Sequence, residues 1–226
     1  MTAKIIEEQA FRGRTLVFRD REHAGKLLAE KLREYNDKRK VMILALPAGG
    51  VPVAYEVAKE LEVPMNVMVV RKIQIPWNTE AGFGALTWDD QIVLNKPLIS
   101  QLGLTKEDIE DSISNTRRNI QERLRKFSGD KPMPDIEGKI VILVDDGLAS
   151  GFTMLAAARS ARKRKIEKLV AAVPTASLGA LKLLSAEVDE AVCLNIRTGP
   201  AFAVAEAYQN WYDLTDEEVT QILERT

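Results

Sequence analysis

Cysteine and histidine are almost missing from this chain of 226 residues, which has one of each. The single cysteine, Cys193, cannot form a disulfide within the chain, and we therefore expect a reducing compartment. One cysteine and one histidine cannot build a His/Cys zinc site, and nothing around His23 suggests a Ser-His-acid triad. These two kinds of catalytic site are excluded.

Excess charge and long apolar runs are also missing. The chain has 32 Lys+Arg and 33 Asp+Glu, so its net charge is -1 and no bulk attraction to nucleic acid or anionic lipid is expected. No uncharged apolar stretch approaches the roughly 18 residues of a membrane span, and the first residues are too polar and acidic for a signal peptide. We expect a cytoplasmic protein with neither a nucleic-acid nor a membrane partner.

Short apolar runs are what the chain does have, and they recur with the length of β-strands. They are VMILAL (41–46), NVMVV (66–70), KIVILV (139–144), LVAAVP (169–174) and AVCLNI (191–196). These runs are continuous rather than alternating, as in strands covered on both faces. Helix-length segments separate most of them, which predicts an α/β fold with a parallel sheet. The length and the lack of a linker predict a single domain over residues 1–226.

Two segments depart from this alternation of strand-length and helix-length segments. Residues 73–95 contain proline, two glycines and two tryptophans, and are interpreted as a long loop or hairpin inserted after the second strand. Residues 105–127 begin with the capping pattern TKED and run from acidic to basic, which complements the dipole of one long helix. Helices are also predicted near the two ends, in EHAGKLLAEKLREY and after the capping box TDEE.

The stretch VILVDDGLASGFTM (141–154) carries the chemistry. Asp145 and Asp146 end a buried strand, and ligands of parallel α/β sheets bind outside such strand ends. The glycine-containing loop that follows opens a helix, so free backbone N–H groups are expected to form an anion site there. Ser150 and Thr153 add hydroxyl donors. The pattern suits a phosphate monoester.

The two carboxylates would repel that phosphate unless a neutral or cationic group lay between them. A sugar resolves the conflict, because vicinal hydroxyls can donate hydrogen bonds to Asp145 and Asp146 while a 5-phosphate rests in the loop. We therefore predict a ribose 5-phosphate ligand. A nucleotide P-loop would need a lysine directly before Ser/Thr, and this loop has none.

VILVDDGLASGFT resembles the signature of the type I phosphoribosyltransferases, in which four hydrophobic residues and two acids precede the loop that holds the 5-phosphate of phosphoribosyl pyrophosphate. The resemblance implies a parallel-sheet core with helices on both faces, an inserted flexible loop at about 73–95 and a small hood built from the chain termini. It implies catalytic roles for Asp145 and Asp146, which are also possible metal ligands. The 5-phosphate loop would consist of Gly147, Leu148, Ala149, Ser150, Gly151, Phe152 and Thr153.

The same resemblance implies a second loop, for pyrophosphate, after the first strand. LPAGGVPVA (46–54) stands there, and its Ala48, Gly49 and Gly50 would bring backbone amides close to the diphosphate. Related chains often carry arginine where this one has Ala48, so the loop lacks a cation. A plain strand-to-helix turn is the alternative interpretation.

Basic and aromatic residues complete the implied site. Arg71 and Lys72 end the second predicted strand, where a basic residue of the family faces the pyrophosphate, although a solvated basic pair is the alternative. The segment 73–95 resembles the mobile loop that closes over the active site. Candidates for stacking on a nucleobase in the hood, with core packing as the alternative, are Phe202, Tyr208 and Trp211.

The implied activity is a magnesium-dependent transfer of ribose 5-phosphate from phosphoribosyl pyrophosphate to a nitrogenous base. A homodimer is expected from the habit of the family. One alternative is a regulatory protein of the same fold that binds phosphoribosyl pyrophosphate or a nucleotide without catalysis, for which Ala48 is the best argument. Another is a receiver-like signalling domain, but there the acid pair normally ends the first strand rather than the third.

Overall fold

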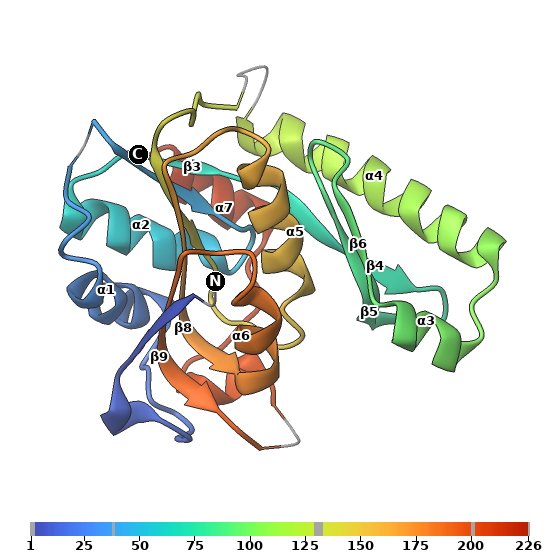
Figure 1. Cartoon of the computed structure of the whole chain (residues 1–226), viewed down its shortest axis with the longest axis horizontal. Helices are drawn as coiled ribbons and strands as arrows, with labels where there is room; N and C mark the ends of the chain where they lie inside the picture. The colour runs from blue at the N-terminus through green and yellow to red at the C-terminus, as the bar shows by residue number, and fades with distance from the viewer. Residues whose placement is uncertain (1–2, 38, 129–132, 200–201, 226) are drawn as a thin grey trace.

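A six-stranded parallel sheet forms the centre of the molecule (Figure 1). The computed structural model describes residues 3–37, 39–128, 133–199 and 202–225. Every pair of neighbouring strands in this sheet is parallel, which confirms the predicted α/β class. The strand order is β1 (Lys4–Glu7), β9 (Glu190–Arg197), β8 (Lys168–Ser177), β7 (Ile140–Val144), β2 (Val41–Ala45) and β3 (Met65–Val67).

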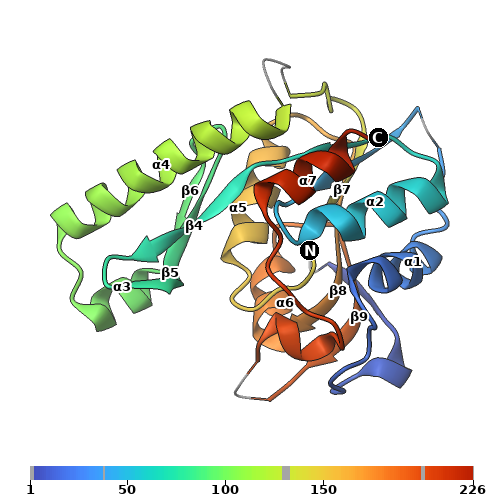
Figure 2. The same ribbon diagram turned by 180° about the vertical axis from the view of Figure 1, so that it is seen from behind.

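Both faces of the sheet are covered by helices, which explains the continuous apolar runs. In β7, Ile142 and Val144 join one hydrophobic core, while Val141 and Leu143 join the other. The first core is shared with α1 (Arg21–Lys31), α2 (Gly50–Leu61) and α7 (Asp216–Leu223). The second is shared with α5 (Phe152–Arg162) and α6 (Leu178–Leu184), on the opposite face (Figure 2).

A second, antiparallel sheet projects from this core. It has the order β4 (Val70–Ile75), β5 (Asn78–Thr87), β6 (Ile92–Leu94), and is followed by α3 (Lys96–Leu102) and α4 (Lys106–Ser128). The long helix predicted at 105–127 is confirmed. Of the two interpretations of the segment 73–95, a long loop or a hairpin, the structure shows the hairpin. It lies between α4 and α5 (Figure 1).

Two predictions about strands were wrong. The apolar run 66–70 is split between the two sheets, because β3 ends at Val67 and β4 begins at Val70. The strand β1, which pairs with β9 at the sheet edge, was not predicted.

The two end regions of the chain meet beside the carboxyl edge of the central sheet. The Phe18 amide donates to the Ala207 carbonyl at 2.9 Å, and the Gln209 amide donates to the Phe18 carbonyl at 2.8 Å. One short 3-10 helix, η1 (Gln9–Phe11), precedes Phe18, and another, η2 (Val204–Ala207), ends at Ala207. Residues near the start and near the end can therefore contribute to one site.

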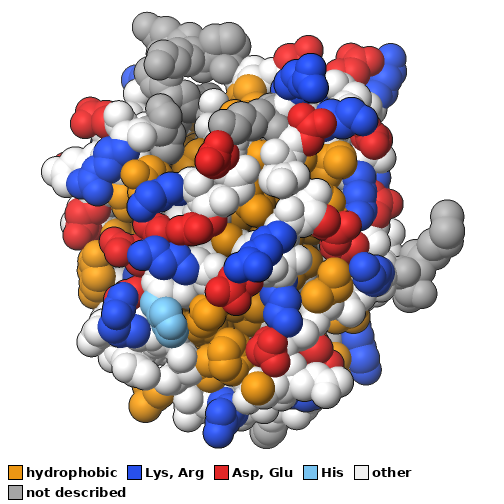
Figure 3. All heavy atoms as spheres, turned by 90° about the vertical axis from the view of Figure 1, so that its left-hand side faces the viewer, with side chains coloured by type: hydrophobic (Ala, Val, Ile, Leu, Met, Phe, Trp, Pro, Cys, Tyr) orange, Lys and Arg blue, Asp and Glu red, His pale blue; other side chains and the backbone are white. Residues whose placement is uncertain are grey.

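The outer surface over α1 and α2 mixes acidic, basic and apolar side chains around the single histidine, His23 (Figure 3). This distribution agrees with the balanced composition. Within the described part of the chain, no helix is both long enough and apolar enough to cross a membrane.

Candidate active site

The acid pair and the predicted pyrophosphate loop leave the sheet side by side. β2 and β7 are neighbours that pair Ala45 with Val144, and each is followed directly by one of the two loops. A Cβ atom on Gly49 would lie 1.9 Å from Oδ2 of Asp146. Because real side chains do not approach so closely, the contact requires glycine at this position. The structure thus brings two sequence-predicted parts of the site together.

Each loop runs into a helix whose N-terminus has no side-chain cap. Gly49 is the N-cap of α2, and Gly151, with a φ of 81°, is the N-cap of α5. The other described α-helices are capped by the side chains of Asp20, Asn95, Thr105, Ser177 and Thr215. Uncapped helix N-termini carry a partial positive charge, which favours anions. At α2, the amides of Gly50 and Val51 already donate to the carbonyls of Leu46 and Ala48, both at 3.1 Å.

The amides of the 5-phosphate loop are available to a ligand. Among the described residues, no acceptor is found for the backbone N–H groups of Ala149–Thr153. The loop itself is fixed, because the Leu148 amide donates to the Thr175 carbonyl at 2.9 Å and the Ser177 hydroxyl donates to the Ala149 carbonyl at 2.8 Å. Leu148 is buried, so this residue of the predicted loop anchors it instead of facing a ligand.

Arg21 is a site residue that the sequence analysis missed. Its Nε donates to Oδ2 of Asp146 at 2.9 Å, and its Nη1 donates to the Tyr212 carbonyl at 2.9 Å. The guanidinium also lies 3.9 Å from the ring centroid of Trp211. Only 7% of the arginine side chain and 13% of the aspartate side chain are exposed. The one signal available was chemical, because a buried acid pair needs a nearby cation.

The hood candidates do not form one stacking surface. Tyr208 is 2% exposed, so its ring has no free face for a base, and its hydroxyl donates to the Asp146 carbonyl at 2.6 Å. One face of Trp211 is taken by Arg21. Phe202 lies apart from these rings, beside Arg197 at 5.8 Å. Tyr208 therefore supports the acid pair, in place of the base-stacking role predicted for it.

The two carboxyl groups of the pair do not ionise independently. Burial, followed by the negative charge of Asp146, holds the pKa of Asp145 well above its usual range. Burial also raises the pKa of Asp146, although the Arg21 guanidinium opposes that rise. The Arg21 guanidinium therefore favours the ionised form of Asp146, its direct partner, and the two carboxyl groups titrate as a pair.

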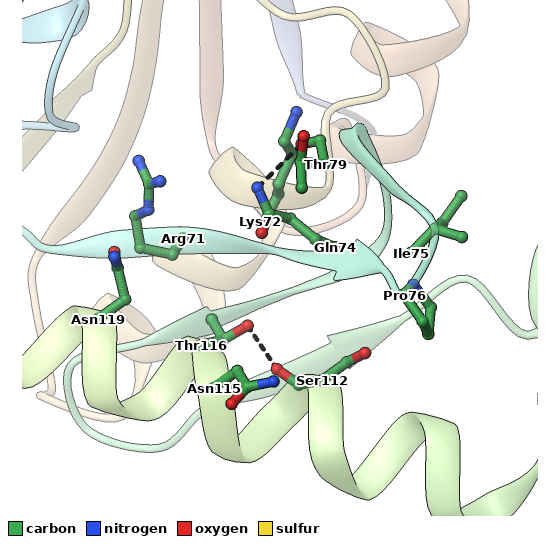
Figure 4. Close-up of a pocket in the computed structure, with 10 residues that line it drawn as sticks. All are labelled: Arg71, Lys72, Gln74, Ile75, Pro76, Thr79, Ser112, Asn115, Thr116 and Asn119. Atoms are coloured by element: carbon green, nitrogen blue, oxygen red, sulfur yellow. Dashed lines mark hydrogen bonds between the residues drawn. The ribbon is translucent and has the colours of Figure 1, made fainter.

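Arg71 and Lys72 lie in a different environment from the acid pair. Both are on β4, and both line a cavity of about 370 Å³ between this strand and α4 (Figure 4). Burial, followed by the nearby charge of Arg123, lowers the pKa of Arg71 to about 10. The role predicted for these two residues at a departing diphosphate stays a prediction.

Comparison with protein families matches residues 92–210, just over half of the chain, to the phosphoribosyl transferase domain. This match spans β6 to the segment after β9 and includes the acid pair with its loop. The chain belongs to the phosphoribosyltransferase family.

Relatives of the chain support both the family and the fold. "Putative phosphoribosyl transferase Rv0571c" of Mycobacterium tuberculosis H37Rv, and MT0597 with the same description from strain CDC 1551, are each 37% identical over 211 residues. That alignment covers 92% of this chain and 47% of theirs, so the chain spans about half the length of these relatives. The crystal structure of TT1426 from Thermus thermophilus has a TM-score of 0.74 and 34% identity, and covers 93% of this chain and 99% of that one.

The predicted pyrophosphate loop has no cationic side chain. Ala48 is half-buried against the apolar core, and the Pro47–Ala48 peptide bond is cis. The next residues, Gly49 and Gly50, are packed against the acid pair, since a Cβ atom on Gly50 would lie 2.9 Å from Cα of Asp145.

The side chains at this site also indicate whether a Mg²⁺ ion fits there. Among the described residues, no cluster of three or more His, Cys, Asp and Glu side chains is suited to hold a metal. Asp145 and Asp146 supply carboxylate oxygens, and Mg²⁺ is commonly bound by one or two carboxylates together with phosphate oxygens of a substrate. The residues therefore fit a Mg²⁺ ion that shares its coordination with a bound diphosphate.

Proposed function

We propose that this phosphoribosyltransferase transfers ribose 5-phosphate from phosphoribosyl pyrophosphate to a nitrogenous base in a magnesium-dependent reaction that releases pyrophosphate. The observation that carries the proposal is that the uncapped N-terminus of α2 packs against the Asp145–Asp146 pair, while the loop that follows this pair leads into the uncapped N-terminus of α5. In this arrangement one terminus receives the diphosphate and the other receives the 5-phosphate. The carboxylates between them accept hydrogen bonds from the ribose hydroxyls.

The reaction breaks the bond between the anomeric carbon and the diphosphate oxygen, which leaves with the electron pair. A nitrogen of the base then bonds to that carbon and loses its proton to solvent. Positive charge grows on the ribose ring ahead of the attack, so nearby carboxylates stabilise the transition state. Bound Mg²⁺ would neutralise charge on the departing diphosphate. The amides of 149–153 hold the far end of the substrate.

Arg21 and Tyr208 preorganise this site. Arg21 binds one carboxylate oxygen of Asp146, Oδ2, which fixes the orientation of this carboxylate. The Tyr208 hydroxyl fixes the backbone carbonyl of the same residue. A carboxylate held at both its side chain and its backbone loses little further freedom when the substrate binds.

The direct test is a pyrophosphate-release assay with phosphoribosyl pyrophosphate, Mg²⁺ and a panel of nitrogenous bases. At least one base is expected to give release, and Asp146→Asn is expected to lower the rate by on the order of 10²–10³-fold, the effect of losing one charge-stabilising group. Circular dichroism of the variant checks that the fold is kept. An unchanged rate in Asp146→Asn would remove the proposed role of the acid pair.

A second candidate function is a non-catalytic protein that binds phosphoribosyl pyrophosphate or a nucleotide. The observation in its favour is Ala48, which leaves the pyrophosphate loop without a cation. Calorimetry with Mg²⁺ and phosphoribosyl pyrophosphate distinguishes the two candidates. Binding without pyrophosphate release from any base supports the second.

A further inference from the structure

The cavity between β4 and α4 lies away from the acid pair. It holds about 370 Å³, roughly the volume of a dozen water molecules. None of the ten described residues that line it is acidic, and none belongs to the loops 46–50 or 145–153. They are Arg71, Lys72, Gln74, Ile75, Pro76, Thr79, Ser112, Asn115, Thr116 and Asn119.

One end of the cavity has a surplus of positive charge. Within the described part of the chain, the half-buried guanidinium of Arg71 has neither a hydrogen bond nor an ion pair. Its neighbour Arg123 has a buried Nη1 without a hydrogen-bond partner among the described residues. The nearby acid, Asp216, is already shared between Arg123 at 3.0 Å and Lys126 at 2.9 Å. The pKa of Arg71, about 10, keeps it charged at neutral pH.

The middle of the cavity is lined by neutral groups with unused hydrogen-bonding capacity. Asn115 and Asn119 are exposed. The side chain of Asn119 makes no hydrogen bond among the described residues, and that of Asn115 uses only its carbonyl oxygen, which accepts from Arg118. Gln74 donates to the Thr79 carbonyl at 2.9 Å, which leaves its own carbonyl oxygen.

The lining changes character from one end to the other. Figure 4 shows Arg71 and Asn119 at one end, the α4 side chains in the middle, and Ile75 with Pro76 at the other end. A matching ligand has an anionic group at one end, a polar body and an apolar tip.

We propose that this cavity binds a small organic oxyanion, whose phosphate or carboxylate group is held by Arg71 and Asn119 and whose apolar part contacts Ile75 and Pro76. A guanidinium fork accepts either oxyanion in a bidentate geometry. This site gives Arg71 a ligand other than the diphosphate. It does not depend on the proposed transfer reaction.

The test uses two probes of matched shape, phenyl phosphate and benzoate, titrated by calorimetry into the whole chain without magnesium. Saturable binding of at least one probe is expected, and the stronger of the two identifies the preferred oxyanion. Arg71→Gln is expected to weaken it by about tenfold or more, the effect of losing a hydrogen bond to a charged group. Failure of both probes to saturate the protein overturns the proposal.

A matched pair of surface variants covers the case in which Arg71→Gln fails to fold. Asn119→Asp adds a negative charge at the cationic end, whereas Gln121→Glu adds the same charge to the opposite face of the same helix. The first is expected to weaken binding by about tenfold, and the second by less than about twofold because solvent screens it. Equal weakening in both overturns the proposal.

Competition with ribose 5-phosphate separates this site from the phosphate loop. Saturating ribose 5-phosphate is expected to leave the affinity for the probe unchanged. Displacement of the probe would place it in the loop and overturn the proposal. Loss of pyrophosphate release in the transfer assay, by contrast, bears only on the proposed function.

Discussion

Replacing Arg21 by methionine is expected to destabilise the fold strongly. The ion pair joins Nε of Arg21 to Oδ2 of Asp146 at 2.9 Å, with only 7% and 13% of the two side chains exposed. Methionine keeps an aliphatic side chain but leaves the carboxylate without its counter-charge. Breaking a buried pair in this way costs about 3–5 kcal/mol, and the lost cation–π contact with Trp211 adds about 0.5–2 kcal/mol.

A double-mutant cycle tests the cause of that loss. In Arg21→Met/Asp146→Asn neither charge remains, so the combined loss of unfolding free energy is expected to fall short of the sum of the single losses by about 0.5–3 kcal/mol. Urea unfolding of the wild type and the three variants measures this coupling. Arg19→Met, which removes an exposed ion pair with Asp20, is the control and is expected to change stability little. Losses that simply add would refute the reasoning.

Three further predictions concern the glycine contact, the acid pair and the cysteine. Gly49→Ala places a Cβ atom 1.9 Å from Asp146, and it is expected to lower the free energy of unfolding by about 1–3 kcal/mol and to stop pyrophosphate release. In Gly179→Ala the nearest atom is 3.9 Å from the new Cβ atom, so this control is expected to raise the free energy of unfolding by about 0.5–1 kcal/mol. Urea unfolding that ranks the two variants in the other order contradicts the packing argument. The raised pKa of Asp145 means that the folded state binds this proton more tightly than the unfolded state, so the stabilisation present below the unfolded pKa of about 3.9 is lost as the pH rises through the folded value. Asp145→Asn cannot ionise at this position, so its free energy of unfolding should rise relative to that of the wild type as the pH increases from about 4 to about 7. A difference between the two proteins that does not change with pH would contradict the raised pKa of Asp145. Burial raises the pKa of Cys193 to about 12, so maleimide labelling of the native protein at pH 8 is expected to be slow, and labelling as fast as in the urea-unfolded protein would disprove this.

The parallel core was predictable because helices on both faces demand uninterrupted apolar strands. The same reasoning failed at 66–70, since the residues on both sides of the break are buried. The Met68 amide still donates to Ala45 of the central sheet, while the Val69 carbonyl accepts from Trp88 of the second sheet. β1 is an edge strand with a half-exposed, partly charged sequence, so it lacks the apolar signal.

The second sheet was harder to predict because glycine usually weakens strands. In β5, a Cβ atom on Gly84 would lie 2.4 Å from the Val93 carbonyl, so this glycine allows a close approach between strands. Glycine in a strand and glycine in a loop look alike in a sequence, which left both the loop and the hairpin interpretations open.

In the candidate site, too, some residues could be predicted from local sequence patterns and others could not. The acid pair and its loop were predicted because their residues are consecutive and the strand end places them. Arg21 lies 125 residues from Asp146 in the sequence, so only tertiary packing brings the two together. The burial of Tyr208 likewise depends on Phe18, whose ring lies 5.5 Å away. Local patterns cannot report such contacts.

The meeting of the two end regions has a consequence for synthesis on the ribosome. Arg21 emerges from the ribosome 191 residues before Tyr212, whose carbonyl completes its surroundings together with the ring of Trp211. Until then the acid pair lacks the hydroxyl of Tyr208 as well. A nascent chain stalled before residue 208 therefore carries its two acids without this shelter.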